Sequence, residues 1–315
     1  MLRAKLILFL LSLSALGFAS AGDRLEVVRI GLAHDSIYAV ERSQNAIWAV
    51  GGHGLVIRST DNGRQWEPIA SPGDFAALDI SIDGGRPVLV GQSGKAFEGD
   101  VAKGSWTQLE TGTEQRLLSV ASLLDGGHIS VGAFGTIIRR LPDSISFSPV
   151  IVNWESVVED GFEPHLYDVL QTRQGSILIA GEFGMILRSD DGGENWSLQN
   201  SNESSVFAIH ENDDGQLIGV GQAGYIILSA DDGKSWQQSY EETSSNLLGV
   251  SSSGERMVAV GVRAILSSYD GGRNWTPLEN QIADRRWFQG IVALSSTKDD
   301  KQFLAGGQFG QIVNF

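Results

Sequence analysis

Residues Gly51-Gly52-His53-Gly54-Leu55-Val56-Ile57-Arg58-Ser59-Thr60-Asp61-Asn62-Gly63-Arg64-Gln65-Trp66 carry the pattern that decides the fold. A glycine turn, G-x-x-G, leads into a short apolar strand and then into S-x-D-x-G-x-x-W. The pattern recurs over 181–196 and 221–236, and one residue shorter over 261–275. Degenerate copies start at Gly91 and Gly132, and a truncated copy runs from Gly307 to Phe315.

The spacing of these copies predicts the architecture. Their seven start points are 40, 41, 49, 40, 40 and 46 residues apart, and repeats near 40 residues are typical of propeller blades. In the fifth unit we expect four strands, at Val206–Glu211, Gln216–Val220, Tyr225–Ser229 and Ser235–Ser239. The last unit ends after its third strand, so Leu25–Ile30 is expected to supply the fourth. The sequence therefore predicts an all-β, seven-bladed propeller closed by its N-terminal strand.

The N-terminus has the pattern of an export signal. Arg3 and Lys5 precede an apolar run, Leu6–Phe18, which ends in Ala19-Ser20-Ala21. A basic start, a short apolar run and an A-x-A ending are typical of a cleavable signal peptide. We therefore expect residues 1–21 to be removed, leaving 22–315 as one propeller in the periplasm. An uncleaved membrane anchor is the alternative.

Composition excludes several classes of function. The chain has 315 residues, 42% of them hydrophobic, which is enough for a sizeable core. Its formal charge of −15 disfavours nucleic acid as a partner. The absence of cysteine excludes disulfides, thiolate zinc sites and iron–sulfur clusters. The five histidines show no metal-ligand spacing, so neither a metal nor another cofactor is expected.

The S-x-D-x-G-x-x-W element resembles the Asp-box of sialidase-like repeat proteins. Its serine and aspartate can bond the backbone of a turn, its glycine permits a positive φ angle, and its tryptophan can pack between blades. We therefore assign the aspartates a structural role and no catalytic one. The four intact sets are Ser59, Asp61, Gly63, Trp66; Ser189, Asp191, Gly193, Trp196; Ser229, Asp231, Gly233, Trp236; and Ser268, Asp270, Gly272, Trp275.

The resemblance to sialidases raises the question of an enzyme. It implies an arginine triad, an Arg-Ile-Pro motif, a tyrosine–glutamate pair and an acid aspartate. The chain has no Arg-Ile-Pro, and Arg58, Arg139 and Arg188 occupy the same slot at the end of a third strand. They are expected to be partly exposed and not to converge. The sequence predicts no catalytic residue, and a carbohydrate-active enzyme or a propeller that binds a glycan or small ligand is the alternative.

Over residues 25–315 the repeats resemble the photosystem II stability/assembly factor family, through strands such as Gly181-Glu182-Phe183-Gly184-Met185-Ile186-Leu187-Arg188-Ser189. The resemblance implies a non-enzymatic propeller that assists assembly of a membrane complex. Relatives in non-photosynthetic bacteria occur beside exporters of the resistance–nodulation–division (RND) type, which implies an integral membrane protein or exporter as partner. Photosynthetic members carry an arginine-rich patch that meets their client, whereas this chain has a strongly negative net charge and scattered arginines. We therefore expect another membrane client, bound by a propeller that is monomeric by itself.

The expected binding face carries the G-x-x-G turns, on the side opposite the Asp-boxes. Aromatic residues on exposed turns and insertions in repeats are typical of contact surfaces. We expect insertions at 151–165, 282–287 and 298–301; the alternative is that the aromatic side chains fold down onto the blades. The candidate partner-binding residues are Phe134, Phe183, Phe309, His53, Trp154, Phe162, His165, Arg116, Arg285, Arg286 and Trp287.

Overall fold

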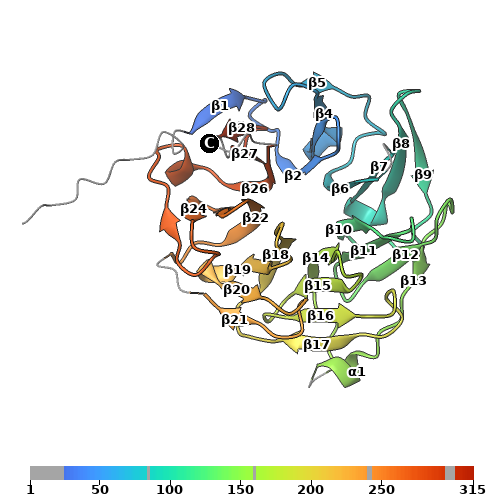
Figure 1. Ribbon diagram of the computed structural model, residues 1–315. Coiled ribbons are helices and arrows are strands. Elements are labelled where there is room, and N and C mark those ends of the chain that lie inside the picture. Colours follow the sequence, from blue (N-terminus) through green and yellow to red (C-terminus); the bar gives the residue numbers. More distant parts are fainter. Residues whose placement is uncertain (1–24, 84–85, 159–160, 240–242, 295–301) are drawn as a thin grey trace, which may run out of the picture.

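The computed structural model describes residues 25–83, 86–158, 161–239, 243–294 and 302–315. They form seven four-stranded antiparallel sheets, arranged as blades around a central channel (Figure 1). Blades 1 to 6 follow one another along the chain, and blade 7 combines three C-terminal strands with the first strand. The predicted seven-bladed all-β propeller is confirmed.

The two inner strands of each blade build the wall of the channel and the core behind it. The first strands are β2 (Ile37–Arg42), β6 (Ala77–Asp83), β10 (Leu117–Ser122), β14 (Leu166–Gln171), β18 (Val206–Glu211), β22 (Leu247–Ser253) and β26 (Phe288–Ala293). The second strands are β3 (Ile47–Gly51), β7 (Arg86–Gly91), β11 (His128–Gly132), β15 (Ile177–Gly181), β19 (Leu217–Gly221), β23 (Arg256–Gly261) and β27 (Phe303–Gly307).

The two outer strands complete each blade, and most of the outermost strands are short. The third strands are β4 (Val56–Ser59), β8 (Ala96–Asp100), β12 (Ile137–Arg140), β16 (Ile186–Ser189), β20 (Ile226–Ser229), β24 (Ala264–Ser268) and β28 (Ile312–Asn314). The fourth strands are β5 (Glu67–Pro68), β9 (Ser105–Leu109), β13 (Ser148–Pro149), β17 (Ser197–Asn200), β21 (Gln237–Gln238), β25 (Thr276–Pro277) and β1 (Glu26–Arg29). The helical turns are α1 (Trp154–Val157), η1 (Gly52–Gly54), η2 (Gln92–Gly94), η3 (Gln222–Gly224) and η4 (Ala283–Arg285).

The N-terminal strand closes the ring, as the sequence predicts. Strand β1 pairs antiparallel with β28, with Glu26 opposite Asn314. First strand β26 of blade 7 then packs beside β2 of blade 1. Strand β28 is therefore paired on both sides, with β27 and with β1, and exposes no free edge.

The core consists of apolar layers between neighbouring blades. One such layer joins Val220 of blade 5 to Leu247 and Met257 of blade 6, and Trp275 covers it. The side chains of β3, β11, β15 and β19 are all buried. These strands are buried on both faces, which explains why they read as continuous apolar runs rather than alternating ones.

Each intact Asp-box closes the turn between the third and fourth strands. The hydroxyl of Ser59 donates to Asp61 (2.9 Å) and accepts the backbone N–H of Gly63 (2.8 Å). Asp61 accepts the N–H of Gln65, and the indole of Trp66 donates to the carbonyl of Gly63. The other three copies repeat these contacts.

The first glycine of each G-x-x-G turn is required by close packing of the backbone. A β-carbon at Gly51 would lie 1.7 Å from the carbonyl oxygen of Ser36, which directly precedes β2, the first strand of the same blade. Any larger residue would push the second strand away from the first. This contact fixes the geometry of the face on which the binding residues were predicted.

The predicted signal peptide, residues 1–21, lies outside the described residues. In the part of the chain that the structure describes, no helix has the length and apolar character needed to cross a membrane.

Candidate functional site: the turn face and the central channel

The turns between second and third strands share one unusual backbone conformation. We call the side of the propeller that carries them the turn face. The third residue of each turn has a φ angle of +53° to +62° in all seven blades. This left-handed conformation costs about 1–2 kcal/mol for a residue other than glycine. The seven residues are His53, Ser93, Phe134, Phe183, Ala223, Arg263 and Phe309.

Blades 3 and 4 present two of these residues as exposed aromatics. Phe134 is 57% exposed and Phe183 is 53% exposed. The ring of His165 contacts Phe134 edge-on with centroids 4.8 Å apart, and Phe162 contacts Phe183 in the same way at 5.2 Å. We call these four side chains the aromatic patch. The insertion before β14 supplies Phe162 and His165, so it completes the patch.

His165 holds the Phe134 turn in place. Its Nδ1 accepts the backbone N–H of Phe134 (3.2 Å), and its own backbone N–H donates to the carboxylate of Glu182 (2.7 Å). A ring nitrogen that accepts a hydrogen bond carries no proton, so this arrangement belongs to the neutral imidazole with its proton on Nε2.

The other predicted residues do not continue the patch around the ring. Phe309 is half-buried beneath the guanidinium of Arg286, which lies 4.6 Å from the ring centroid. Trp287 stacks on Tyr38 at 6.0 Å. His53 is exposed and contacts His34. These residues form a second group over blades 7 and 1, so the predicted aromatic ring divides into two separate groups.

Trp154 is a correction to the predicted site. It was placed among the partner-binding residues because it lies in the 151–165 insertion, but it begins α1 and is only 8% exposed. It packs into the core between blades 3 and 4, close against the turn at Gly135. It therefore supports the patch from beneath and offers no surface to a partner.

The two remaining predicted arginines lie on the surface at separate places. Arg285 is exposed at the end of η4, and Arg116 is exposed just before β10. Residues 298–301, predicted as an insertion, lie outside the described residues, as do residues 159–160 of the insertion at 151–165.

A groove of about 630 Å³ runs from the patch toward the centre of the turn face. Arg116 and Glu114 are the charged residues among those that line it. It joins a funnel of about 390 Å³ at the mouth of the channel through shared lining residues, among them Arg116 and Tyr167. The funnel is mostly apolar and aromatic, lined by Tyr38, Leu78, Leu118, Tyr167, Phe207 and Leu248.

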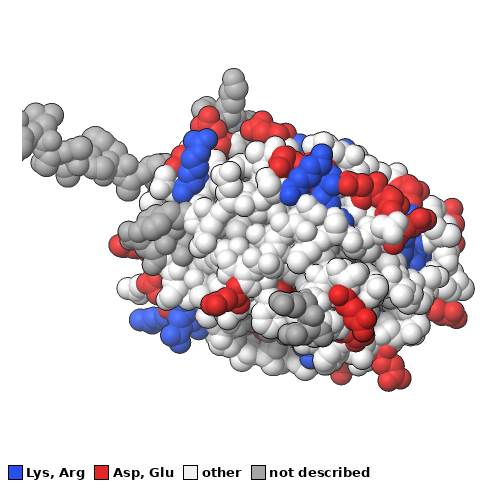
Figure 2. Space-filling view, turned by 90° about the horizontal axis from the view of Figure 1, so that it is seen from below, with Lys and Arg blue, Asp and Glu red and all other residues white. Residues whose placement is uncertain are grey.

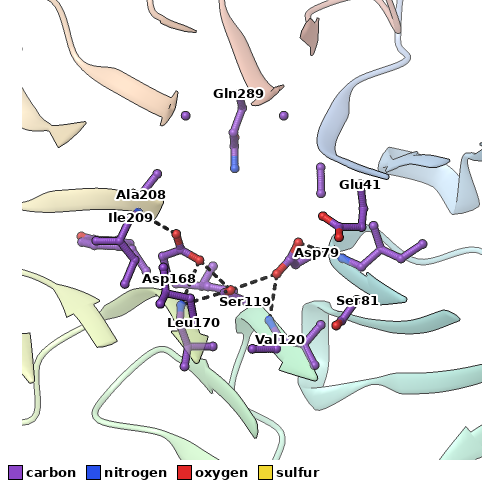
Figure 3. Close-up of a pocket in the computed structure, with 18 of the residues that line it drawn as sticks. Glu41, Asp79, Ser81, Ser119, Val120, Asp168, Leu170, Ala208, Ile209 and Gln289 are labelled. Carbon is purple, nitrogen blue, oxygen red and sulfur yellow. Dashed lines mark hydrogen bonds between the residues drawn. The ribbon is translucent and has the colours of Figure 1, made fainter. Parts of the chain in front are cut away.

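Below the funnel, three carboxyl groups face the channel (Figure 3). Asp79 and Asp168 lie at equivalent positions of β6 and β14, with Ser119 of β10 between them. Glu41 comes from β2, and the side chain of Gln289 points into the same space from β26. Sequence reasoning missed this cluster. For Asp79, Ser119 and Asp168 the signal was a polar residue at a first-strand position that is alanine or glycine in the other four blades, whereas Glu41 lies at a different position of β2.

Burial shifts the pKa values of these carboxyl groups upward. Removal from water, together with the nearby charges of Asp79 and Asp168, raises the pKa of Glu41 to about 8. Burial likewise raises the pKa of Asp79 to about 7 and that of Asp168 to about 6, although backbone N–H groups bonded to both oppose the shift. Displaced pKa values in a cavity are typical of functional sites, although ion networks of purely structural role produce them too.

The arginines that a sialidase-like site would need do not converge. Arg58 pairs with Glu67 (2.5 Å) and Arg139 with Asp125 (2.5 Å), each within its own blade. Arg188 was expected to be partly exposed but is 7% exposed, and it pairs with Asp232 of blade 5 (2.9 Å). None of the residues that line the channel is an arginine. Among the described residues, no group of histidines and carboxylates is suited to hold a metal ion.

Figure 2 shows the edge of the disc that carries α1 and β17. Acidic and basic side chains are interspersed along its upper margin, and the wall beneath carries scattered acidic groups and a small basic group. Basic residues form no continuous surface there, so this edge offers no arginine-rich patch.

Comparisons with known proteins support the fold. The BNR/Asp-box repeat model matches residues 187–198. A solved structure of "YCF48 bound to D1 peptide" is 18% identical, with a TM-score of 0.71, and the match covers 97% of this chain and 99% of that one. YCF48 from Cyanidioschyzon merolae is 16% identical, with a TM-score of 0.72 and coverage of 92% and 98%.

A propeller of another kind is similar to the same degree. The WD40 repeats of RRP9 are 14% identical, with a TM-score of 0.71 and coverage of 94% and 98%. The search of curated proteins gives no match. The chain thus has the fold of a YCF48-like, seven-bladed propeller with a BNR/Asp-box repeat.

Proposed function

We propose that this protein is a non-catalytic interaction module that binds an apolar segment of a protein partner on its turn face. The carrying observation is the pair Phe134 and Phe183, which are exposed on adjacent blades in a backbone conformation that costs free energy. Exposed aromatics held this way add little to the core, and aromatic side chains are enriched at interaction hot spots. The solved YCF48 structure with a bound peptide supports a protein ligand.

The groove suggests how such a segment would bind. The aromatic patch would hold an apolar or aromatic side chain, and the groove would accommodate the backbone that follows it toward the funnel. Arg116, exposed on the groove wall, would donate hydrogen bonds to a carbonyl or carboxylate oxygen of the partner. We further propose that the partner belongs to an integral membrane complex outside the cytoplasm, such as an exporter of the RND type, on the strength of the sequence resemblance alone.

The test replaces Phe134 and Phe183 together by serine. We expect capture of the partner from detergent-solubilised host membranes, read by crosslinking and mass spectrometry, to fall about thirtyfold or more, as loss of about 2 kcal/mol implies. The control is Ala223→Ser, which alters the same turn position of blade 5. Unchanged capture by the double variant, with the melting temperature preserved, would place the binding surface elsewhere.

A small-ligand site in the funnel is the second candidate, because an apolar, aromatic mouth leads to a few polar groups. Its test is a thermal-shift screen of glycans and amphipathic solutes. A true funnel ligand should raise the melting temperature of the wild type but not of Leu118→Trp, whose larger side chain narrows the mouth. If the screen finds no such ligand, the small-ligand candidate is rejected and the protein-binding proposal is unaffected.

A further inference from the structure

One hydroxyl group lies between two carboxyl groups in the channel (Figure 3). The Oγ of Ser119 is 2.9 Å from Oδ2 of Asp79 and 2.9 Å from Oδ1 of Asp168. A serine hydroxyl has a single proton to donate, and an ionised carboxylate has none. With both aspartates ionised, one of the two contacts would bring oxygen lone pairs together without a proton. The geometry therefore requires one more proton than the serine supplies.

The two carboxyl groups also accept hydrogen bonds from backbone N–H groups of their own strands and of the next blades. Asp79 accepts the N–H of Ile80 on its own strand and that of Val120 on β10, each at 2.8 Å. Asp168 accepts the N–H of Val169 at 2.9 Å and that of Ile209 on β18 at 2.8 Å. The row of hydrogen bonds through Asp79, Ser119 and Asp168 thus links the first strands β6, β10, β14 and β18, which belong to blades 2 to 5.

We propose that Asp79, Ser119 and Asp168 share one proton, and that this proton clasps blades 2 to 5 together at the channel. Ser119 donates to one carboxyl group and accepts from the other, which is protonated. When the proton leaves, one contact becomes repulsive and two negative charges remain side by side. Cohesion between these blades is then weaker, so the channel wall responds to pH.

Among the described residues, no titratable group around the clasp forms an ion pair with Asp79 or Asp168, so the negative charge left after loss of the proton is not neutralised. The groups on neighbouring first strands are Tyr38, Glu41 and Arg42 on β2, Tyr167 on β14, and His210 and Glu211 on β18. Arg42 donates to the carbonyl of Ala293, and Glu211 accepts the backbone N–H of Arg173. Strands β22 and β26 place Gly249, Gly290 and Gln289 at the channel. None of the ion pairs among described residues includes Glu41, Asp79 or Asp168.

The raised pKa values of Asp79 and Asp168, about 7 and about 6, agree with a proton held at neutral pH. The pKa shift also determines how the stability of the fold changes with pH. A carboxyl group that keeps its proton to higher pH when folded stabilises the fold at low pH, and this contribution is lost as pH rises through the folded pKa. The clasp should therefore hold at mildly acidic pH and open above about pH 8.

The position of the clasp connects it with the binding groove. Strand β10 begins directly after Arg116, and β14 begins directly after His165, so two of the three strands that carry the clasp start at groove residues. Loss of the proton should therefore also weaken partner binding; this consequence alone rests on the proposed function.

The test uses the mature chain with Glu41→Gln, so that Asp79 and Asp168 are the only carboxyl groups left in the cluster. Infrared difference spectra between about pH 5 and pH 8 should show the loss of a protonated-carboxyl C=O band. Adding Asp79→Asn should abolish the band, because an asparagine amide donates to Ser119 without needing the shared proton. The matched control is Asp214→Asn, at an exposed aspartate of the loop between β18 and β19, which should leave the band unchanged.

Denaturant unfolding across the same range gives an independent measurement. Relative to the Asp79→Asn variant, the unfolding constant of the parent should rise about hundredfold between about pH 5 and pH 8, as a folded pKa near 7 predicts. Absence of the band, or equal pH dependence in parent and variant, would overturn the clasp.

The clasp and the proposed function can fail separately. If the band and the pH dependence are found but partner capture is the same at both pH values, the clasp stands and its control of the groove is wrong. If Phe134→Ser/Phe183→Ser leaves capture intact, the proposed function is wrong and the spectroscopic result is unaffected.

Discussion

Aspartate side chains in the Asp-box turns and in the channel have pKa values shifted in opposite directions. In the turns, hydrogen bonds from Asn195, Ser235 and Asn274 lower the pKa values of Asp191, Asp231 and Asp270 to about 2. In the channel, burial raises the pKa of Asp79 to about 7 and that of Asp168 to about 6. Both groups accept hydrogen bonds from backbone N–H groups, so the number of such bonds does not explain the difference.

Exposure to water and neighbouring charge decide the direction of the shift. An Asp-box carboxylate lies near solvent, and its contacts are a serine hydroxyl and donors four residues later. The channel carboxyl groups lie half-buried beside one another, where desolvation and repulsion outweigh the hydrogen bonds. Asp61 has a shift in the same direction, because the backbone N–H of Gln65 lowers the pKa of this exposed-turn carboxylate.

The two regions therefore stabilise the fold in different pH ranges. The Asp-box carboxylates contribute above about pH 4, and their contribution is lost as pH falls toward 2. The channel carboxyl groups contribute most below about pH 4, and theirs is lost as pH rises through 6 to 8. The fold should be most stable between about pH 4 and 6, where both contributions are largely present.

The largest effect should come from breaking an Asp-box at its tryptophan. Trp275 is 6% exposed, donates to the carbonyl of Gly272 and covers the core between blades 5 and 6. Trp275→Ala should lower the free energy of unfolding by about 3–5 kcal/mol. Denaturant unfolding measures it, with Trp66→Ala as comparison, since Trp66 is only partly buried. Equal losses in the two variants would contradict burial as the source of the effect.

Removal of the Asp-box hydroxyl should be the next largest effect. Ser189 is 1% exposed, and its hydroxyl donates to Asp191 and accepts the N–H of Gly193. Ser189→Ala leaves a buried N–H without its acceptor, which should cost about 1–3 kcal/mol by denaturant unfolding. The control is Ser201→Ala, an exposed serine just after the same blade. A cost no greater than that of the control would mean that the turn closes without its serine.

These turns were predictable from sequence because every contact in them is local. Ser189, Asp191 and Gly193 lie within five residues, so each copy of the motif carries its whole geometry and the repeat spacing then fixes the fold. The channel cluster could not be found this way. Asp79, Ser119 and Asp168 are 40 and 49 residues apart, and only the ring brings them together.

The candidate binding face was predictable in part. The positions of Phe134 and Phe183 follow from their place in the G-x-x-G turns, because the turn conformation is the same in each blade. Trp154 was misplaced because the length of an insertion does not reveal which of its side chains turns inward. Burial of Arg188 likewise depends on Asp232 from the next blade, which the sequence around Arg188 does not indicate.

A third prediction concerns the basic group of the channel. Burial lowers the pKa of His210 to about 4, and its Nε2 lies 2.8 Å from the hydroxyl of Ser252. Because the unfolded chain binds a proton near pH 6.5, His210 destabilises the fold as pH falls from 6.5 to 4, opposite in sign to the carboxyl groups. In His210→Asn the free energy lost over this range should be smaller by about 1 kcal/mol, since the ring is only half-buried. A pH profile parallel to that of the wild type would mean that His210 titrates normally.

The smallest effect should come from a single Asp-box charge. Asp231 is exposed and accepts from the backbone N–H and the hydroxyl of Ser235. Asp231→Asn keeps an acceptor oxygen but cannot be protonated in the acid range, so the variant should lose less stability than the wild type between about pH 4 and pH 2. Solvent screening limits the difference to about 0.5 kcal/mol. Acid unfolding followed by tryptophan fluorescence measures it, with Asp214→Asn as the exposed control. A difference as large as that of the half-buried His210 would show that exposure does not separate the two regions, and the physical distinction between turn and channel would fail.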